Sequence, residues 1–285
     1  MFENIIKNVH NRHPLIHCIT NYVSINDCAN IVLACGGAPI MAEDINEVSQ
    51  ITSICQGLDI NIGMLNDNKL SSMLKAGATA NELGIPVILD PVGAGSSDYR
   101  IKAVQNLMSN VQLGVIRGIK AIAAKQGIHN IAAGVYDTMQ KDKSAMGVEA
   151  GIADKITDDN IKEMADFINK LSQKTGAVIA VTGGIDMVAD ENRVYAIRNG
   201  HKMMSLVTGA GCQLSALTSA YVAADKEHIL ESVCAAVSVM GISGELAYRR
   251  MAEVDGNASY RNYIIDAVYN MTDDTLKELG RIERI

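Results

Sequence analysis

The sequence contains no tryptophan, two phenylalanines and four prolines among its 285 residues. With aromatic residues at 4%, glycine, alanine and methionine must fill the interior, which favours closely packed helices and tight turns over aromatic clusters. Hydrophobic residues make up 48% and charged residues 20%, as in typical globular proteins. Because no stretch resembles a linker and a chain of this length can bury most of its apolar surface, we predict one domain over residues 1–285.

Basic tracts, long apolar runs and paired cysteines are also lacking. The net charge is −7 and no run of lysine or arginine occurs, which argues against nucleic acid or an anionic membrane as a partner. No apolar stretch is expected to span a bilayer, and the polar N-terminus does not resemble a secretory signal. The six cysteines form no C-x-x-C pair, so we predict reduced thiols and a cytoplasmic protein.

Short apolar runs alternate with amphipathic stretches along most of the chain, which predicts an α/β fold with a mainly parallel sheet and helices on both faces. Strands are expected at 58–63, 85–90, 113–116 and 177–181, and helices at 69–83, 101–108, 119–125 and 160–175. The following stretch predicts an antiparallel meander of short strands at 185–189, 193–197 and 201–207. Helices are expected again at 211–224, 229–251, 257–270 and 273–278.

Several catalytic signatures are absent. The sequence has no G-x-S-x-G, no G-x-x-x-x-G-K-[ST] and no G-x-G-x-x-G, which disfavours an α/β-hydrolase, a P-loop enzyme and a dinucleotide-binding domain. No H-E-x-x-H occurs, and the spacing of His10, His13 and His17 matches no metal site. We therefore expect these three histidines at the surface.

Two Gly-Ala-Gly loops follow expected strands, at residues 89–95 (LDPVGAG) and 207–212 (VTGAGC). Asp90 comes at a strand end, where a carboxylate can hold Mg²⁺ or its waters. In the second loop, Gly209 and Gly211 flank Ala210 and let backbone N–H groups approach a ligand closely. The helix that follows adds unpaired amides and a positive dipole end, so the loop is a candidate anion hole for a phosphoryl group in transfer.

Cys212 falls in the first turn of that helix. This position predicts a lowered thiol pKa, and a thiolate could accept the proton of a substrate hydroxyl or align that hydroxyl. From spacing alone, other interpretations remain open. A G-x-G after a strand is more often a plain tight turn, a buried cysteine is more often inert, and an aspartate at a strand end often only caps a turn.

Seven segments, taken together and in this order, are specific: PLIHCITNYVSINDCAN (14–30), GGAPIMAE (36–43), NIGML (61–65), ANELGIPVILDPVGAG (80–95), VIRG (115–118), IAVTGGIDMV (179–188) and NGHKMMSLVTGAGC (199–212). On these segments the chain resembles the hydroxyethylthiazole kinase family of the ribokinase-like superfamily. The resemblance implies a ribokinase-like three-layer α/β sandwich. It also implies that Mg-ATP phosphorylates the hydroxyethyl group of methyl-hydroxyethylthiazole in thiamine biosynthesis or salvage, in a homotrimer with active sites at subunit interfaces.

The resemblance also assigns residues. Contacts to the thiazole are implied for Met41, Asn21, Val23 and Gly209, contacts to ATP for Arg117, Thr182 and Thr208, and a place in the Mg²⁺ shell for Asp90. Cys212 would stand where related kinases carry an aspartate base, with Gly209, Ala210 and Gly211 as the catalytic loop.

The sequence departs from the family pattern directly after Arg117-Gly118. In the family, this Arg-Gly is followed by Asn, two variable residues, a Glu that helps with Mg-ATP, and then Ile. Here Ile119 comes directly after Gly118. A helix that began at Ile119 would lack a side-chain N-cap and a usual connection to the strand. We therefore hypothesise that a short segment is missing between these two residues. The stretch 136–146 is longer than in the family, and we assign it no role.

Other functions fit the same fold. A hydroxymethylpyrimidine or sugar kinase is a close alternative, although such enzymes usually carry Asp where this chain has Cys212. A nucleotide-dependent hydro-lyase that acts on hydrated nicotinamide cofactors is a second. A nucleotide-binding protein without turnover is a third, because the family's Glu has no counterpart here.

Overall fold

The computed structural model describes residues 3–118 and 156–285, and their strands form one sheet in the order β2-β1-β3-β4-β5-β6-β7-β8-β9. The pairings from β2 to β6 are parallel, and those from β6 to β9 are antiparallel. The strands are β1 (Leu15–Ile19), β2 (Ala38–Ile40), β3 (Gly57–Asn61), β4 (Val87–Asp90), β5 (Val115–Gly118), β6 (Val178–Val181), β7 (Asp186–Ala189), β8 (Val194–Ile197) and β9 (Ile282–Arg284).

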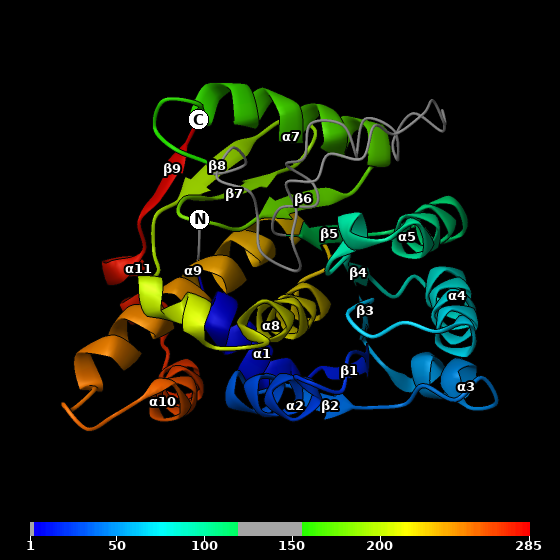
Figure 1. The fold of residues 1–285 in the computed structure, drawn as a ribbon, viewed down its shortest axis with the longest axis horizontal. Helices are drawn as coiled ribbons and strands as arrows, with labels where there is room; N and C mark the ends of the chain where they lie inside the picture. Colours follow the sequence, from blue (N-terminus) through cyan, green and yellow to red (C-terminus); the bar gives the residue numbers. More distant parts are fainter. Residues whose placement is uncertain (1–2, 119–155) are drawn as a thin grey trace.

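Helices cover both faces of this sheet, as Figure 1 shows for α8 and α9 on one side and α4 and α5 on the other. The helices are α1 (Ile5–Arg12), α2 (Ile25–Ala34), α3 (Val48–Ile54), α4 (Asp67–Glu82), α5 (Asp98–Asn110), α7 (Ile161–Thr175), α8 (Ala210–Ala224), α9 (Ile229–Arg250), α10 (Asn257–Tyr269) and α11 (Asp273–Leu279). One buried apolar cluster joins the sheet to α1, α2, α8, α9 and α10, and a second joins it to α4, α5 and α7. The predicted α/β layering is confirmed.

Two helices form the centre of the first cluster. Every residue of α8 from Cys212 to Ala224 is buried, which explains its small, mainly uncharged side chains. By length and composition alone, α9 could cross a bilayer, contrary to the expectation from sequence, but 78% of its apolar window is buried inside the structure. It packs against α8 and α10 as a core helix.

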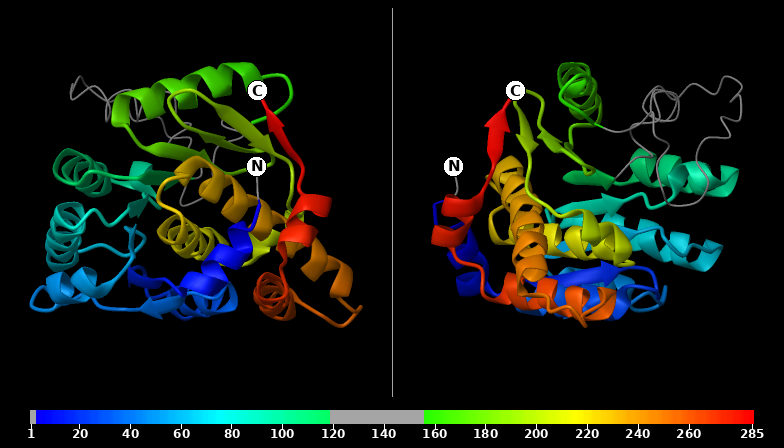
Figure 2. Two further views of the ribbon diagram at one scale, coloured as in Figure 1. Left: turned by 180° about the vertical axis from the view of Figure 1, so that it is seen from behind. Right: turned by 60° about the vertical axis from the view of Figure 1, so that its left-hand side comes forward.

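The antiparallel part differs from the prediction in two places. The strand expected at 201–207 is wrong: residues Lys202–Leu206 form a 3₁₀ helix, and the His201 ring stacks on Tyr248 with centroids 3.7 Å apart. The third antiparallel strand is instead β9 near the C-terminus, which lies beside β8 at the sheet edge (Figures 1 and 2). Because β8 and β9 are far apart in the sequence, no short stretch of sequence predicts that they pair.

His17 is also placed differently from the prediction. It is fully buried in β1, where its Nδ1 lies 2.8 Å from Thr52 Oγ1 and its Nε2 lies 2.8 Å from the carbonyl oxygen of Ala42. Burial lowers the pKa of this imidazole, so it serves as a neutral hydrogen-bonding group inside the protein.

The expected helix at 119–125 and the stretch 136–146 lie outside the described residues. The hypothesis of a missing segment is wrong, because the full sequence of 285 residues has Ile119 directly after Gly118. The departure from the family pattern at this point therefore belongs to the chain itself.

Candidate functional site

The carboxyl ends of the parallel strands bring polar side chains together at one edge of the sheet. Asn61 and Asp90 are the last residues of β3 and β4, Arg117 lies in β5, Thr182 follows β6, and Asn21 lies two residues beyond β1. In open sheets of this kind, ligands bind beyond the carboxyl ends of the strands. The amino end of α8 points at the same place, since Ser215 and Gly211 of this helix bond to the strand residues.

Asp90 is the centre of the network. Its Oδ2 accepts hydrogen bonds from Asn61 Nδ2 at 2.9 Å, Ser215 Oγ at 2.8 Å and Arg117 Nη1 at 3.3 Å. Burial raises the pKa of this carboxyl, and the neighbouring Arg117 charge and the three bonds only partly offset that effect. The sequence singled out Asp90 but not Asn61 or Ser215, although Asn61 has the same strand-end position.

Arg117 ties three elements together from a fully buried position. Besides Asp90, its guanidinium donates to the carbonyl oxygen of Gly211 at 2.9 Å and to Thr182 Oγ1 at 3.0 Å. Its Nε has no hydrogen-bond partner within residues 3–118 and 156–285. A buried donor without a partner carries an energetic cost, and the guanidinium is the side-chain group best suited to carboxylate and phosphate oxygens.

The glycine before α8 lies against the start of α2. Gly209 has φ +76°, and a β-carbon added there would lie 2.5 Å from Cβ of Ser24. Only glycine fits this combination of a left-handed backbone and close approach. Gly211 and Cys212 follow in the first turn of α8, where backbone N–H groups have no intrahelical acceptor. Thr208, one residue earlier, is exposed. Ala210 N–H donates to the carbonyl oxygen of Val207 at 3.4 Å, so the anion-hole prediction rests on the amides of Gly211 and Cys212.

Cys212 is protonated in this environment, contrary to the thiolate prediction. The side chain is 7% exposed, and burial together with the charge of Asp90 raises the pKa of the thiol. Asn21 Nδ2 donates to Cys212 Sγ at 3.1 Å and to Asn61 Oδ1 at 3.1 Å. Hydrogen bonds with Ser24, Asn21 and Asn61 lower the pKa of this thiol, but they do not outweigh burial.

The two apolar residues expected at the acceptor lie on neighbouring segments. Val23 follows Asn21 and is 63% exposed, whereas Met41, directly after β2, is half-buried against the core. The structure therefore brings Asn21, Cys212 and the Gly209 loop together by direct contacts, and it leaves Val23 open at the surface.

A buried acid lies just behind the site. Asp59 in β3 is fully buried, and neither of its carboxyl oxygens has a hydrogen-bond partner in the part of the chain that the structure describes. Burial, reinforced by the charge of Asp90, raises its pKa well above the usual range, so the carboxyl is neutral at pH values where an exposed aspartate is charged.

This acid predicts a pH-dependent stability. The folded state holds the Asp59 proton more tightly than the unfolded chain, so the contribution of Asp59 to the free energy of unfolding falls as pH rises above about 4, by about 1.4 kcal/mol per pH unit until the raised pKa is reached. Asp59→Asn removes this contribution and makes the protein relatively more stable at neutral pH. Urea unfolding at a series of pH values measures the slope, with the exposed Glu253→Gln as control. An unchanged slope in Asp59→Asn would show that Asp59 titrates normally.

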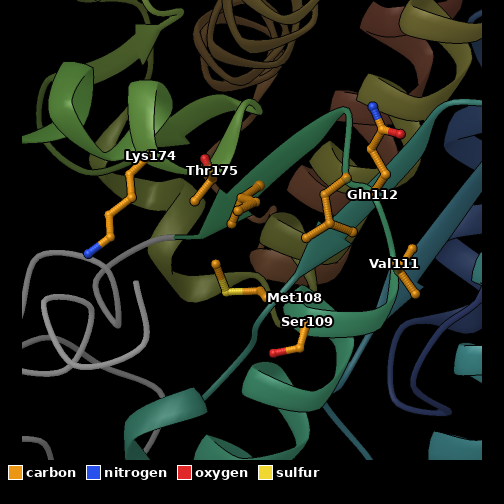
Figure 3. Close-up of a pocket in the computed structure, with 8 residues that line it drawn as sticks. Met108, Ser109, Val111, Gln112, Lys174 and Thr175 are labelled. Carbon is orange, nitrogen blue, oxygen red and sulfur yellow. The ribbon is translucent and has the colours of Figure 1, made fainter. Parts of the chain in front are cut away.

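A hollow of about 230 Å³ opens on the opposite edge of the sheet. Figure 3 shows Met108 and Ser109 from the end of α5 and Lys174 and Thr175 from the end of α7 around it. It lies near the amino ends of β5 and β6 and contains none of the site residues described above. Among the described residues there is also no group of three or more His, Cys, Asp or Glu that could hold a metal ion by itself.

The comparisons with known proteins agree with the geometry. The model of the hydroxyethylthiazole kinase family matches residues 6–274. A curated hydroxyethylthiazole kinase of Clostridium acetobutylicum is 50% identical over 99% of both chains, and one of Methanobrevibacter smithii is 40% identical over 98% of this chain and 95% of the relative.

Comparison with solved structures supports the same family and fold. A hydroxyethylthiazole kinase structure from Pyrococcus horikoshii matches with a TM-score of 0.82 and 29% identity, covering 99% of this chain and 98% of that one. The pyridoxal kinase of Staphylococcus aureus matches with a TM-score of 0.56 at 16% identity, over 95% and 97% of the two chains, which supports the ribokinase-like fold alone. The chain belongs to the hydroxyethylthiazole kinase family.

Proposed function

We propose that this enzyme transfers the terminal phosphoryl group of ATP to the hydroxyethyl group of methyl-hydroxyethylthiazole, a step of thiamine biosynthesis or salvage. The observation that carries the proposal is the bond from Arg117 to the Gly211 carbonyl, which fixes the first turn of α8 over the network of Asp90. Family membership over nearly the whole chain supports the choice of the thiazole alcohol.

The phosphate side of the reaction uses backbone amides and Arg117. The Gly211 carbonyl and the Cys212 N–H belong to one peptide group, in which C=O and N–H point in opposite directions. Because Arg117 binds the carbonyl, the N–H points away from Arg117, toward the amino end of α8. Preorganised amides of this kind stabilise the charge that develops on the transferred phosphoryl oxygens. We assign Thr182 and Thr208 to the ATP phosphates on either side, since Thr182 already contacts the guanidinium.

Asp90 fits a place in a magnesium shell. Mg²⁺ is usually held by one or two carboxylates together with waters and phosphate oxygens. Asp90 is a strand-end carboxylate whose three side-chain hydrogen bonds to described residues all use Oδ2. When bound, the ion neutralises charge on the ATP phosphates. The chain lacks the Glu that the family carries after Arg-Gly, so Asp90 is the carboxylate that we assign to this shell.

On the acceptor side, Cys212 holds the hydroxyl in place and does not act as a thiolate base. Phosphoryl transfer is largely dissociative and needs positioning more than early removal of the hydroxyl proton. We assign Asn21, which contacts Cys212, to the thiazole together with Val23, Met41 and Gly209. The uncharged side chains of Val23 and Met41 suit a flat heterocycle.

We also propose a homotrimer in the cytoplasm, over one domain that spans the chain. The large exposed apolar side chains Val23 and Leu206 support an interface near the site, and all six cysteines are free and buried. Sedimentation of the purified enzyme distinguishes a trimer from a monomer of 30.5 kDa.

A competition between acceptors tests the proposed function. With saturating Mg-ATP, we expect kcat/KM for the thiazole alcohol to exceed that for hydroxymethylpyrimidine by at least about a hundredfold, since a mismatched ring loses several contacts at once. The phosphorylated products are identified by mass spectrometry. A preference for the pyrimidine would reassign the enzyme within the fold. Absence of turnover with both alcohols would favour the hydro-lyase or a binding protein.

A further inference from the structure

A buried lysine, a glutamate and an exposed tyrosine form a cluster beside the acceptor side of the site. Tyr22 donates its hydroxyl hydrogen bond to Glu43 Oε1, and Lys69 Nζ lies 2.7 Å from Glu43 Oε2. The same ammonium lies 4.6 Å from the centroid of the Tyr22 ring and donates to the carbonyl oxygen of Thr20. We call Tyr22, Glu43 and Lys69 the acceptor latch.

The position of Lys69 is not explained by its own helix. It lies in the first turn of α4, where the helix dipole disfavours a cation, yet its side chain is only 3% exposed. A buried ammonium requires partners, and those that the structure provides are Glu43, Thr20 and the ring of Tyr22. The charge of Lys69 is therefore directed at two other segments of the chain.

Those two segments carry the residues that we assign to the thiazole. Tyr22 stands between Asn21 and Val23, and Glu43 comes two residues after Met41. The carbonyl of Ala42 is held from the other side by His17.

The protonation states suit this contact. Partial burial opposes ionisation of Glu43, but the bonds from Lys69 and Tyr22 outweigh it and the pKa is lowered. The bond to this carboxylate raises the pKa of Tyr22 and keeps its hydroxyl a donor. The latch thus joins the loop after β1 to the segment after β2 by a charge-assisted bond.

Resting on the proposed function, we propose that the acceptor latch is a positioning device that sets the separation of these two segments and thereby the affinity for the alcohol. Tyr22 and Glu43 act through their neighbours Asn21, Val23 and Met41. ATP binds through Arg117 and the α8 loop, on other elements, so the latch affects one substrate and not the other.

Steady-state kinetics of Tyr22→Phe and Glu43→Gln test the latch. Each is expected to raise KM for the thiazole alcohol about five- to tenfold, the effect of losing one hydrogen bond to a charged group, with kcat and KM for ATP within about twofold of wild type. Tyr22→Phe removes only the bond to Glu43, whereas Glu43→Gln also takes the carboxylate charge from Lys69, so the double variant is expected to be no worse than Glu43→Gln alone. Tyr99→Phe is the matched control, since Tyr99 of α5 also donates to a carboxylate, Asp67 in the first turn of α4, but its bond joins neither the loop after β1 nor the segment after β2.

Amide hydrogen exchange measured without substrate tests the latch independently of the proposed function. In Tyr22→Phe we expect faster amide exchange in both residues 20–24 and residues 41–44, and in Tyr99→Phe in neither. This result holds whether or not the wild type phosphorylates the thiazole alcohol, whereas wild-type turnover alone decides the function. Unchanged exchange in both segments, or equal rises of KM for the alcohol and for ATP, would overturn the latch.

Discussion

Gly209→Ala is expected to lower kcat/KM for the thiazole alcohol by about a hundredfold or more. The new β-carbon would lie 2.5 Å from Cβ of Ser24, so the loop must move away from α2 before the variant can fold. That movement displaces the amides at the start of α8 and the thiol of Cys212, and misplacement by about 1 Å can cost about a hundredfold in rate. Steady-state kinetics with both substrates measure the loss.

Two further variants test whether the loss of activity in Gly209→Ala comes from displacement of the loop. Gly176→Ala adds the same methyl group at a similar backbone angle, φ +70°, but with no atom within 4 Å, so it is expected to reduce stability slightly and leave kinetics unchanged. Cys212→Ala removes the thiol and is expected to slow the enzyme by about tenfold or less, because the hydroxyl keeps its other contacts. If Cys212→Ala proved more damaging than Gly209→Ala, the thiol would be a true base.

Arg117→Met is expected to reduce kcat by roughly a thousandfold and the free energy of unfolding by about 3 kcal/mol. The first effect follows because the guanidinium orients the Gly211 peptide and, in the proposed function, binds the ATP phosphates. The second follows because Asp90 would stay buried without its cationic partner. Kinetics and urea unfolding measure the two effects separately.

A second substitution distinguishes these effects. Arg117→Met with Asp90→Asn removes both charges, so we expect much of the stability to return while activity stays lost. Arg193→Met is the control for loss of an arginine in ion pairs, since Arg193 bonds to Asp190 and Glu231 away from the site. Recovery of activity in the double variant would mean that Arg117 serves only to neutralise Asp90.

The sequence predicted the positions of the site residues better than their chemical states. Asp90 and Gly209 could be found because strand ends and glycine-rich turns leave a local pattern. The protonation state of Cys212 could not be predicted from the sequence, because it depends on burial beside Asn21 and on the nearby Asp90. Both residues are distant from Cys212 in sequence.

The same limit applies to the fold. The parallel strands from β3 to β6 were predicted from alternating apolar and amphipathic stretches, each of which can be recognised within a short segment of the sequence. The pairing of β8 with β9 joins segments more than 80 residues apart, and the stack of His201 on Tyr248 accompanies a 3₁₀ helix where apolar residues suggested a strand. Asn61 and Ser215 became functional candidates only once the sheet and α8 brought them to Asp90.

The most direct test is transfer of a labelled terminal phosphoryl group from ATP to the thiazole alcohol by the purified protein with Mg²⁺. We predict labelled thiazole phosphate in equal amount to the ADP released, and loss of this product in Arg117→Met. Release of labelled inorganic phosphate without labelled thiazole phosphate, or undiminished product in Arg117→Met, would contradict a phosphoryl-transfer site built on Arg117 and the first turn of α8.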